Sequence, residues 1–351
     1  MKLWYFTPLT FPSRFVNRLQ VMKMAAAFTK HADFTLYIAR SDFSGGDLFR
    51  AYNVPTSLRV VCVGETLLWP RRFWQARRFL THIIHAPTEV VWYCRDVLLA
   101  DWLLFLSSRF RNRYVFELHT LVRFSDYRYK RVLSHARCII TTNEEKKKDI
   151  ITQFGIPAEK VLVMPNGVDF EEFQDLKDKK TEIRKELGID EHISLVVYAG
   201  TDMEAYGTEV LREAACLLPH TVHIEIVSGK TRNEALRYMA AADVLVAPYL
   251  AANDHFIKYM SPMKIREYMA MERPMVVSDL PAIRAYLPTD DCAFFAKSGD
   301  AVHLAEKITE AVVNMEEAKR RARYTCEMAH EKGYSTETRA KLIIDLMETY
   351  V

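Results

Sequence analysis

Short apolar runs alternate along this chain with longer segments in which apolar residues recur every three or four positions. The short runs predict buried strands, and the longer segments predict amphipathic helices. In the first half, the pattern predicts strands at residues 2–6, 35–39, 58–63, 90–93, 114–118 and 138–142, and helices at residues 16–30, 72–85, 98–110 and 144–154. In the second half, it predicts strands at residues 195–199, 223–228, 244–248, 275–278 and 293–295, and helices at residues 209–217, 233–241, 263–271 and 303–314. This alternation predicts an α/β architecture with parallel sheets.

A domain boundary is predicted near residue 165. An apolar run at 161–164 ends at the strong turn signal Pro165-Asn166-Gly167, and a charged stretch at 171–186 follows. We expect an N-terminal domain of residues 1–165, a C-terminal domain of residues 166–334, and a helix at about 335–351 that is able to pack back on the first domain. Two successive arrays of this kind predict two Rossmann-like, doubly wound domains that face each other across a cleft, with ligands bound at the carboxyl ends of the strands.

The composition excludes several classes of protein. With 50% hydrophobic and 26% charged residues among 351, the chain is close to the globular average, which excludes collagen-like, disordered and small disulfide-rich chains. The six cysteines are scattered without a Cys-x-x-Cys pair, so neither a zinc ribbon nor a thioredoxin-like site is expected, and the thiols are predicted to be reduced in the cytosol. No Gly-x-Gly-x-x-Gly follows an early strand and no Walker A loop is present, so no classical dinucleotide site or P-loop is predicted.

No targeting or spanning segment is predicted. The first ten residues form an apolar run without a small-residue cleavage site after it. The longest apolar stretch, residues 97–107, contains Asp101 and is shorter than the roughly 18 residues that a spanning helix needs. We therefore expect a cytoplasmic protein, either free or peripheral on the inner face of the membrane.

Charge is distributed unevenly along the chain. The formal net charge of +3 combines an excess of Lys and Arg in the N-terminal half with an excess of Asp and Glu in the C-terminal half. The N-terminal half is therefore expected to face an anionic partner, although a simple drift of surface charge between domains is the alternative.

The segment at residues 67–85 combines aromatic residues with four arginines: Arg71, Arg72, Arg77 and Arg78. Arg-rich aromatic helices bind anionic membrane surfaces or lipid-phosphate head groups, so these arginines are candidates for the acceptor or membrane side. Arg14, in the first loop between a strand and a helix, is a further candidate. An ordinary helix with solvated arginines is the alternative. No nucleic-acid-binding module is recognised.

The stretch at residues 248–287 carries the most specific candidate chemistry. Ser261 is a good N-cap, and Pro262 then occupies the first helical position. Lys264 falls in the first turn and Glu267 one turn further. A helix N-terminus beside a lysine suits a diphosphate, and the following glutamate is able to accept hydrogen bonds from the vicinal hydroxyls of a ribose. An ordinary surface helix is the alternative.

This stretch resembles the donor-binding signature of the retaining glycosyltransferases of family 4, which have the GT-B fold of two Rossmann-like domains. The signature has the form S-P-x-K-x-x-E-Y-[ML]-A, followed by P-x-V-x-S-D-x-P. Its positions are matched by Ser261, Pro262, Lys264, Glu267, Tyr268, Met269, Ala270, Pro274, Ser278, Asp279 and Pro281. Further blocks that resemble the family are VFELH at 115–119, TNEEKKK at 142–148, the segment 159–173, and VYAG at 197–200.

The resemblance implies roles for matching residues. Glu267 would bind the ribose of the donor, while Gly200, Ser261, Pro262, Met263 and Lys264 would surround its diphosphate. His119 would lie beside the donor sugar, so that His119 and Lys264 are the candidate catalytic residues. It also implies retention of anomeric configuration, no catalytic metal, and no cofactor beyond a nucleotide-diphosphate sugar as donor. The chain contains no Asp-x-Asp motif, in agreement with metal independence.

The chain departs from the family pattern at several positions. Thr201 and Tyr206 stand where the family carries an arginine and a lysine on the diphosphate, Tyr259 where a carboxylate is usual, and Glu272 where a glycine is usual. The segment that normally helps to hold the base is short, and the first loop lacks glycine. Because a bound diphosphate needs compensating charge, replacement cations are expected. The candidates are Lys230, Lys258, Lys264 and Arg14.

The sequence therefore predicts a glycosyltransferase that moves a sugar from a nucleotide-diphosphate sugar to a glycan or lipid-linked acceptor. Electrostatic stabilisation of the departing diphosphate would carry the reaction. A non-catalytic GT-B subunit of a glycan-synthesis system is an alternative because two cations are missing. A sugar-phosphate or epimerase-type GT-B enzyme is a further one.

Overall fold

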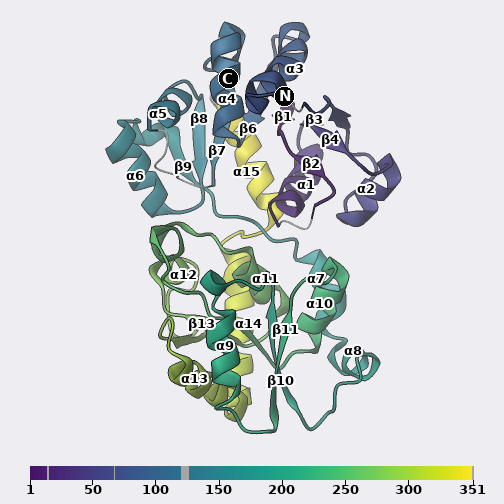
Figure 1. Cartoon of the computed structure of the whole chain (residues 1–351), viewed down its shortest axis with the longest axis vertical. Helices are drawn as coiled ribbons and strands as arrows, with labels where there is room; N and C mark the ends of the chain where they lie inside the picture. Colours follow the sequence, from purple (N-terminus) through teal and green to yellow (C-terminus); the bar gives the residue numbers. More distant parts are fainter. Residues whose placement is uncertain (14–15, 67, 120–125, 350–351) are drawn as a thin grey trace. The chain divides into compact units, whose positions relative to one another are not determined.

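The computed structural model describes residues 1–13, 16–66, 68–119 and 126–349, and the chain divides into two compact units (Figure 1). Unit 1 consists of Met1–Pro165 and Thr336–Val351, and unit 2 of Asn166–Ser335. The chain therefore leaves unit 1 once and returns to it with its last helix. Arg14 lies outside the described residues.

Unit 1 is built on a parallel seven-stranded sheet of order β5-β3-β1-β6-β7-β8-β9. Its strands are rich in aromatic and β-branched residues, and most are buried on both faces, as parallel sheets require. The strands are β1 (Lys2–Phe6), β3 (Asp33–Ile38), β5 (Val60–Cys62), β6 (Val90–Cys94), β7 (Tyr114–Leu118), β8 (Cys138–Thr141) and β9 (Val161–Val163), with a separate pair formed by β2 (Thr10–Phe11) and β4 (Arg40–Ser41). The register pairs Tyr5 with Tyr93, and Cys94 with Phe116.

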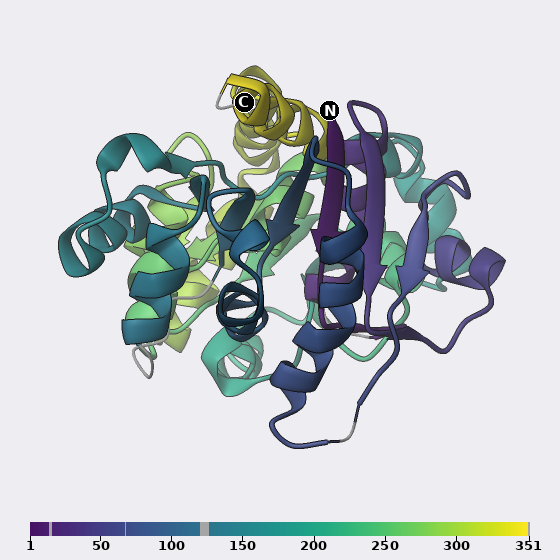
Figure 2. The ribbon, with the colours of Figure 1, turned by 90° about the horizontal axis from the view of Figure 1, so that it is seen from above.

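Helices cover both faces of this sheet. The core on one face contains residues of α3 (Arg71–His85), α4 (Val97–Leu106), α5 (Asp126–Ser134) and α6 (Glu144–Phe154). The core on the other contains residues of α1 (Val16–Thr29), α2 (Gly45–Ala51) and α15 (Thr336–Thr349). In Figure 2 the yellow helix α15 and the blue helix α3 lie on opposite sides of the strands.

Unit 2 repeats this arrangement around a parallel five-stranded sheet of order β11-β10-β12-β13-β14. The strands are β10 (Ser194–Ala199), β11 (Val222–Val227), β12 (Val244–Ala247), β13 (Met275–Ser278) and β14 (Phe294–Ala296). One face is covered by α9 (Thr208–Ala215) and α13 (Ala301–Val313). The other is covered by α7 (Glu171–Lys177), α8 (Lys180–Glu186), α10 (Arg232–Ala241), α11 (Met263–Met271) and α12 (Pro281–Arg284), while α14 (Met315–Glu331) contributes to both cores.

The strands and helices predicted from the pattern are present, and most ends agree within two residues. The helix predicted at 98–110 is shorter, because Ser107 is extended and ends α4 at Leu106. Helix α14 and the short helices α2, α5, α7 and α12 were not predicted. The prediction of an α/β fold with parallel sheets is confirmed.

In each sheet the strand order reverses once as the chain proceeds. The reversal falls between β1 and β6 in unit 1 and between β10 and β12 in unit 2. Loops leave in opposite directions at such a point and open a crevice at the carboxyl ends of the strands, where ligands of doubly wound folds bind. The two reversal points are therefore the places where a functional site is expected.

Candidate functional site

In unit 2 the reversal point is bordered by helix α11. The Tyr268 hydroxyl accepts a 3.1 Å hydrogen bond from the Ala199 N–H at the end of β10 and donates one of 3.3 Å to the Val246 carbonyl in β12. These bonds fix α11 across the two strands that flank the reversal. Gly200 follows β10 directly, and a Cβ atom there would lie 2.9 Å from the Lys264 Nζ atom. The structure therefore brings Gly200 and Lys264 together, as the sequence predicted.

The Lys264 ammonium lies among three tyrosine rings. Its Nζ atom is 3.4 Å from the ring centre of Tyr198, 5.3 Å from that of Tyr249 and 5.5 Å from that of Tyr206. Nζ is buried and has no hydrogen-bond partner within the described part of the chain. Burial lowers the pKa of Lys264 well below its ordinary value, and Glu267 offsets this only in part.

A close backbone contact brings Tyr206 to this place. Gly207 has φ 74°, and a Cβ atom there would lie 1.7 Å from the Pro248 carbonyl oxygen, so only glycine fits. The short turn Glu204–Tyr206 is thereby held against the end of β12, and its Tyr206 ring meets the Tyr249 ring at 5.6 Å. Where the family pattern carries a lysine, this chain therefore has Tyr206, whose aromatic ring lies beside Lys264.

Helix α11 spans the predicted residues 263–271, but its N-cap was predicted one position too early. The helix begins at Met263 with Pro262 as its N-cap residue, and Ser261 does not cap it. Pro262 is extended, with ψ 115°, which moves Ser261 one residue away from the cap. The Ser261 hydroxyl is buried without a hydrogen-bond partner among residues that the structure describes. The free N–H groups of the first turn of α11 still provide an anion site beside it.

Glu267 is engaged by a residue that sequence reasoning missed. The Arg232 guanidinium, at the start of α10, contacts the Glu267 carboxylate at 2.5 Å and the Glu172 carboxylate at 2.9 Å. The Glu267 side chain is 13% exposed, so it remains accessible beside this ion pair. Of the proposed replacement cations, Lys230 is exposed just beyond β11, and Lys258 lies 3.9 Å from Asp254.

In unit 1, His119 follows β7 and contacts a buried carboxylate. Its Nε2 atom lies 2.5 Å from a carboxylate oxygen of Glu117, which is 1% exposed. Burial and the nearby Arg95 lower the pKa of His119 to about 3, although Glu117 opposes this shift. The imidazole is therefore neutral at physiological pH. Glu117 and His119 are two residues apart, a spacing that places both side chains on one face of a strand.

Several charged side chains gather around Glu117. The Arg339 guanidinium donates to it, the Tyr93 hydroxyl donates at 2.6 Å, and Arg95 lies at 3.5 Å. Burial alone would raise the pKa of Glu117, but Arg339, His119 and Arg95 hold it well below its ordinary value. The carboxyl group is therefore ionised.

A buried lysine belongs to the same end of the sheet in unit 1. The Lys146 ammonium, in the first turn of α6, donates to the Thr142 hydroxyl just beyond β8. Its burial lowers the pKa of Lys146 to about 7, with opposing effects from Glu117 and Arg95. The sequence analysis gave TNEEKKK at 142–148 only as a block that resembles the family and assigned Lys146 no role of its own.

The four arginines of α3 do not form a single free cationic patch. Arg71 pairs with Glu65, and Arg72 lies 3.2 Å from Asp96. Arg78 donates to the Val63 carbonyl at 3.3 Å, and Arg77 stacks 5.4 Å from the Trp74 ring centre. Arg77 and Arg78 are exposed, and neither forms an ion pair among the described residues.

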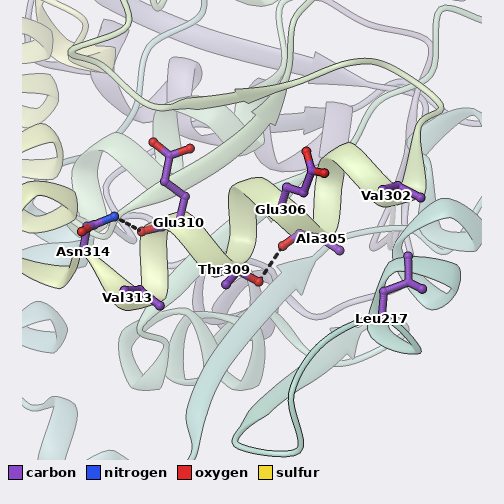
Figure 3. A pocket seen from close by; sticks show the side chains of 8 residues that line it. All are labelled: Leu217, Val302, Ala305, Glu306, Thr309, Glu310, Val313 and Asn314. Atoms are coloured by element: carbon purple, nitrogen blue, oxygen red, sulfur yellow. Dashed lines mark hydrogen bonds between the residues drawn. The ribbon is translucent and has the colours of Figure 1, made fainter.

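A shallow pocket of about 530 Å³ lies on the outer surface of α13 (Figure 3). Within it, Thr309 donates to the Ala305 carbonyl at 2.9 Å and Asn314 to the Glu310 carbonyl at 3.1 Å, both as local helix contacts. Its lining carries the carboxylates of Glu306 and Glu310 but no basic side chain, and includes none of the residues predicted from the sequence. This pocket therefore has no features suited to a diphosphate.

Two other classes of site find no support among the described residues. Within residues 1–13, 16–66, 68–119 and 126–349, no three or more His, Cys, Asp or Glu side chains form a group that could hold a metal ion. None of the helices in those ranges has the length and apolarity needed to cross a membrane.

Family comparisons match both units. Residues 19–172 match the model described as Glycosyltransferase Family 4, and residues 168–314 match the model described as Glycosyl transferases group 1. The two matches overlap at residues 168–172 and together cover most of both units.

Individual relatives agree with these matches. The chain is 25% identical over 198 residues to a Bacillus subtilis protein named for teichuronic acid biosynthesis, the glycosyltransferase TuaC; the match covers 52% of this chain and 48% of that protein. It is 25% identical over 117 residues to the D-inositol 3-phosphate glycosyltransferase of Xylanimonas cellulosilytica, covering 32% of this chain and 28% of that protein. The chain therefore spans about half the length of the first of these curated relatives, and less of the second.

A solved structure extends the likeness to the entire fold. Anabaena Alr3699/HepE, in complex with UDP-glucose, superimposes with a TM-score of 0.76, 14% identity and coverage of 100% of both chains. At this identity the likeness concerns the fold, which is that of two Rossmann-like domains.

Proposed function

Since this chain belongs to the GT-B glycosyltransferases described by the group 1 and family 4 models, we propose that it transfers a sugar from a nucleotide-diphosphate sugar to a glycan or lipid-linked acceptor. We further propose that the transfer retains the anomeric configuration and needs no metal ion, as the resemblance to family 4 implies. The relative HepE was crystallised with UDP-glucose, which makes a uridine donor the first to test.

The observation that carries the proposal is a group of hydrogen-bond donors without acceptors, at the point in unit 2 where the strand order reverses. The Lys264 Nζ and the Ser261 Oγ atoms are both buried, and neither has a hydrogen-bond partner in the described ranges. A buried ammonium without an acceptor is costly, and a bound anion would compensate it. The first-turn N–H groups of α11 add further donors, as phosphate sites at helix N-termini do. A diphosphate suits this combination.

The residues of the candidate site have separate roles in the proposed reaction. The bond between the sugar C1 and the diphosphate oxygen breaks, and its electron pair leaves with the phosphate. Lys264 and the N-terminus of α11 stabilise the negative charge that develops there. Glu267 accepts hydrogen bonds from the ribose, and His119 contacts the sugar. The acceptor oxygen bonds to C1 and passes its proton to the departing diphosphate oxygen.

Calorimetry with UDP, GDP and ADP tests the donor site directly. We expect one nucleotide to bind, and Lys264→Met to weaken it at least tenfold, about 1.4 kcal/mol. Lys319→Met is the matched control, because Lys319 is a half-exposed lysine on α14 with no proposed role in the donor site, and it is expected to leave affinity unchanged. If none of the three nucleotides binds, or if both variants bind like the wild type, the donor site is wrongly assigned.

Turnover requires separate experiments. Release of nucleoside diphosphate from a nucleotide sugar is expected to continue in EDTA, which tests metal independence. Proton NMR of the product is expected to show the anomeric configuration of the donor, and an inverted anomer would contradict retention.

A non-catalytic GT-B subunit remains a second candidate, favoured by the surroundings of Lys264. Thr201 and Tyr206 replace both cations of the family pattern, and tyrosine rings rather than basic groups line the site. Nucleotide binding without turnover, across a panel of nucleotide sugars and lipid-linked acceptors, would favour this candidate.

We also propose that the protein acts at the cytoplasmic face of a membrane through α3 and α4. Trp69 is 89% exposed just before α3, and Phe105 on α4 is 67% exposed. Phe73 and Trp102 pack between these helices at 5.0 Å, and the exposed Arg77 and Arg78 supply positive charge. Exposed aromatic residues beside arginines are typical of membrane-surface helices.

Co-sedimentation with vesicles tests this surface. We expect binding to vesicles that contain phosphatidylglycerol, weaker binding at high salt, and loss of binding in Trp69→Ala/Phe105→Ala. Val302→Ser, which removes an exposed apolar side chain from unit 2, is the control. Equal binding to neutral vesicles, or no binding to anionic ones, would contradict the proposal.

A further inference from the structure

The last helix of the chain inserts an arginine into the core of unit 1. Helix α15 lies beside α1 in Figure 1, and its Arg339 side chain is 3% exposed. The guanidinium is held on several sides. It lies 3.3 Å from the Met164 carbonyl and 3.4 Å from the Met24 sulfur, and it donates to the Glu117 carboxylate. Such a buried charge is fixed in position by its surroundings.

Arg339 is the most direct charge partner of Glu117. The Arg95 Nε atom is 3.5 Å from the same carboxyl group, and Tyr93 donates a neutral hydrogen bond. A carboxylate with 1% exposure is ionised only if cations compensate it. Removal of Arg339 would therefore favour the protonated carboxyl group.

The protonation state of Glu117 decides which nitrogen of His119 carries the proton. An ionised carboxylate only accepts hydrogen bonds, so the His119 Nε2 atom, 2.5 Å away, must donate. Because the imidazole is neutral, its Nδ1 atom is then an unprotonated acceptor. A protonated Glu117 would instead donate to Nε2 and move the ring proton to Nδ1. The ring would then lose its accepting nitrogen.

From these contacts we infer that Arg339 is a positioning residue that sets the tautomer of His119 through Glu117. The C-terminal helix thereby prepares His119 to accept a hydrogen bond from a sugar hydroxyl. This consequence for transfer rests on the proposed function, whereas the tautomer itself is a property of the free protein.

Nitrogen-15 NMR of the histidine rings tests the inference without any substrate. In the wild type, His119 is expected to show a protonated Nε2 and an unprotonated Nδ1, with the signals assigned by their loss in His119→Gln. In Arg339→Met, the proton is expected to move to Nδ1, or the signals of the two nitrogens are expected to average between the two tautomers. Lys341→Met is the matched control, because it removes an exposed positive charge from the same helix. It is expected to keep the wild-type pattern.

Two further variants separate a role in positioning from a role in folding. Arg339→Lys retains the charge and is expected to keep the wild-type tautomer. Glu117→Met removes the acceptor of the Nε2 proton and is expected to disturb the tautomer even with Arg339 present, and it serves as the test if Arg339→Met does not fold. An unchanged His119 pattern in folded Arg339→Met, or in Glu117→Met, would overturn the inference.

Kinetics then connect the tautomer to transfer. We expect Arg339→Met to lower kcat at least tenfold and to change nucleotide affinity less than twofold, because the nucleotide contacts belong to unit 2. A kcat within twofold of the wild type would overturn the link to transfer. If the wild type transfers no sugar, the proposed function fails, but the NMR pattern still decides whether Arg339 sets the tautomer.

Discussion

The Nζ atom of Lys264 lies 3.4 Å from the centre of the Tyr198 ring, near the closest approach that two such groups make. The ring face offers the ammonium an electrostatic partner, which compensates in part for the missing hydrogen bonds. The Tyr198 hydroxyl donates to the Thr201 carbonyl at 2.6 Å, and the Lys264 Nζ atom contacts the face of the ring and not this hydroxyl oxygen. Lys264 is therefore held in place with its N–H groups available to a ligand.

Nucleotide binding is expected to take up protons. Burial lowers the pKa of Lys264 well below its ordinary value, and a diphosphate beside it would raise that pKa again. At pH 8, above the titration of the phosphates themselves, the calorimetric enthalpy should rise with the ionisation enthalpy of the buffer, with a slope between zero and one proton. The slope should vanish in Lys264→Met. A zero slope in the wild type would show that Lys264 is already charged in the free protein.

Glu267→Ala is expected to weaken nucleotide binding by about 1.5–3 kcal/mol, the range for hydrogen bonds to a charged group. The variant also frees Arg232, which keeps its 2.9 Å contact with Glu172, so we expect the fold to survive. Calorimetry with UDP measures the effect, and Glu306→Ala, on the outer surface of α13, is the control. Unchanged affinity in Glu267→Ala would remove this residue from the donor site.

Restoring the two cations of the family pattern should have opposite effects on the free and the bound protein. Tyr206→Lys combined with Thr201→Arg would place new positive charge within reach of the Lys264 ammonium, since the Tyr206 ring is 5.5 Å from it. We expect a lower melting temperature without nucleotide and a larger thermal shift on addition of UDP. A thermal shift no larger than in the wild type would mean that position 206 does not face the diphosphate.

Lys146→Met is expected to stabilise the protein at neutral pH by about 1–4 kcal/mol, the gain found when buried charge is replaced by apolar groups. The pKa of Lys146 is about 7 in the folded state and near 10.5 in the unfolded state. Between these values the unfolded chain binds more protons, so the wild type gains stability as the pH rises from 7 towards 10.5.

The advantage of Lys146→Met should therefore be largest at or below pH 7 and shrink by pH 9.5. Urea unfolding at pH 6.5, 8 and 9.5 measures this difference, in which other titrating groups cancel. Lys148→Met, an exposed position on the same helix, is expected to change stability little. An advantage that is independent of pH would contradict the lowered pKa.

Residues close together in the sequence were the easiest to interpret from the sequence. The pairing of His119 with Glu117 follows from the alternation of a strand, and it could have been predicted from the spacing alone. The replacement of glycine by Glu272 was also visible. Glu272 keeps the left-handed conformation of a helix end, with φ 54°, and pairs with Lys177 at 2.8 Å. The side chain at this position differs from the family pattern, whereas the backbone has the left-handed conformation that glycine usually adopts at a helix end.

The sequence by itself determined the alternation of strands and helices and the parallel α/β fold, and its resemblance to family 4 singled out Gly200, Lys264 and Glu267. These features follow from local apolar periodicity and from short motifs, which act over a few neighbouring residues. Only the tertiary structure decided what surrounds Lys264 and His119. The tyrosines around Lys264 come from separate segments, and Arg339 reaches Glu117 from the opposite end of the chain. Such contacts depend on how strands and helices pack, which no local pattern encodes, and packing in turn sets the burial that governs the charge of each group.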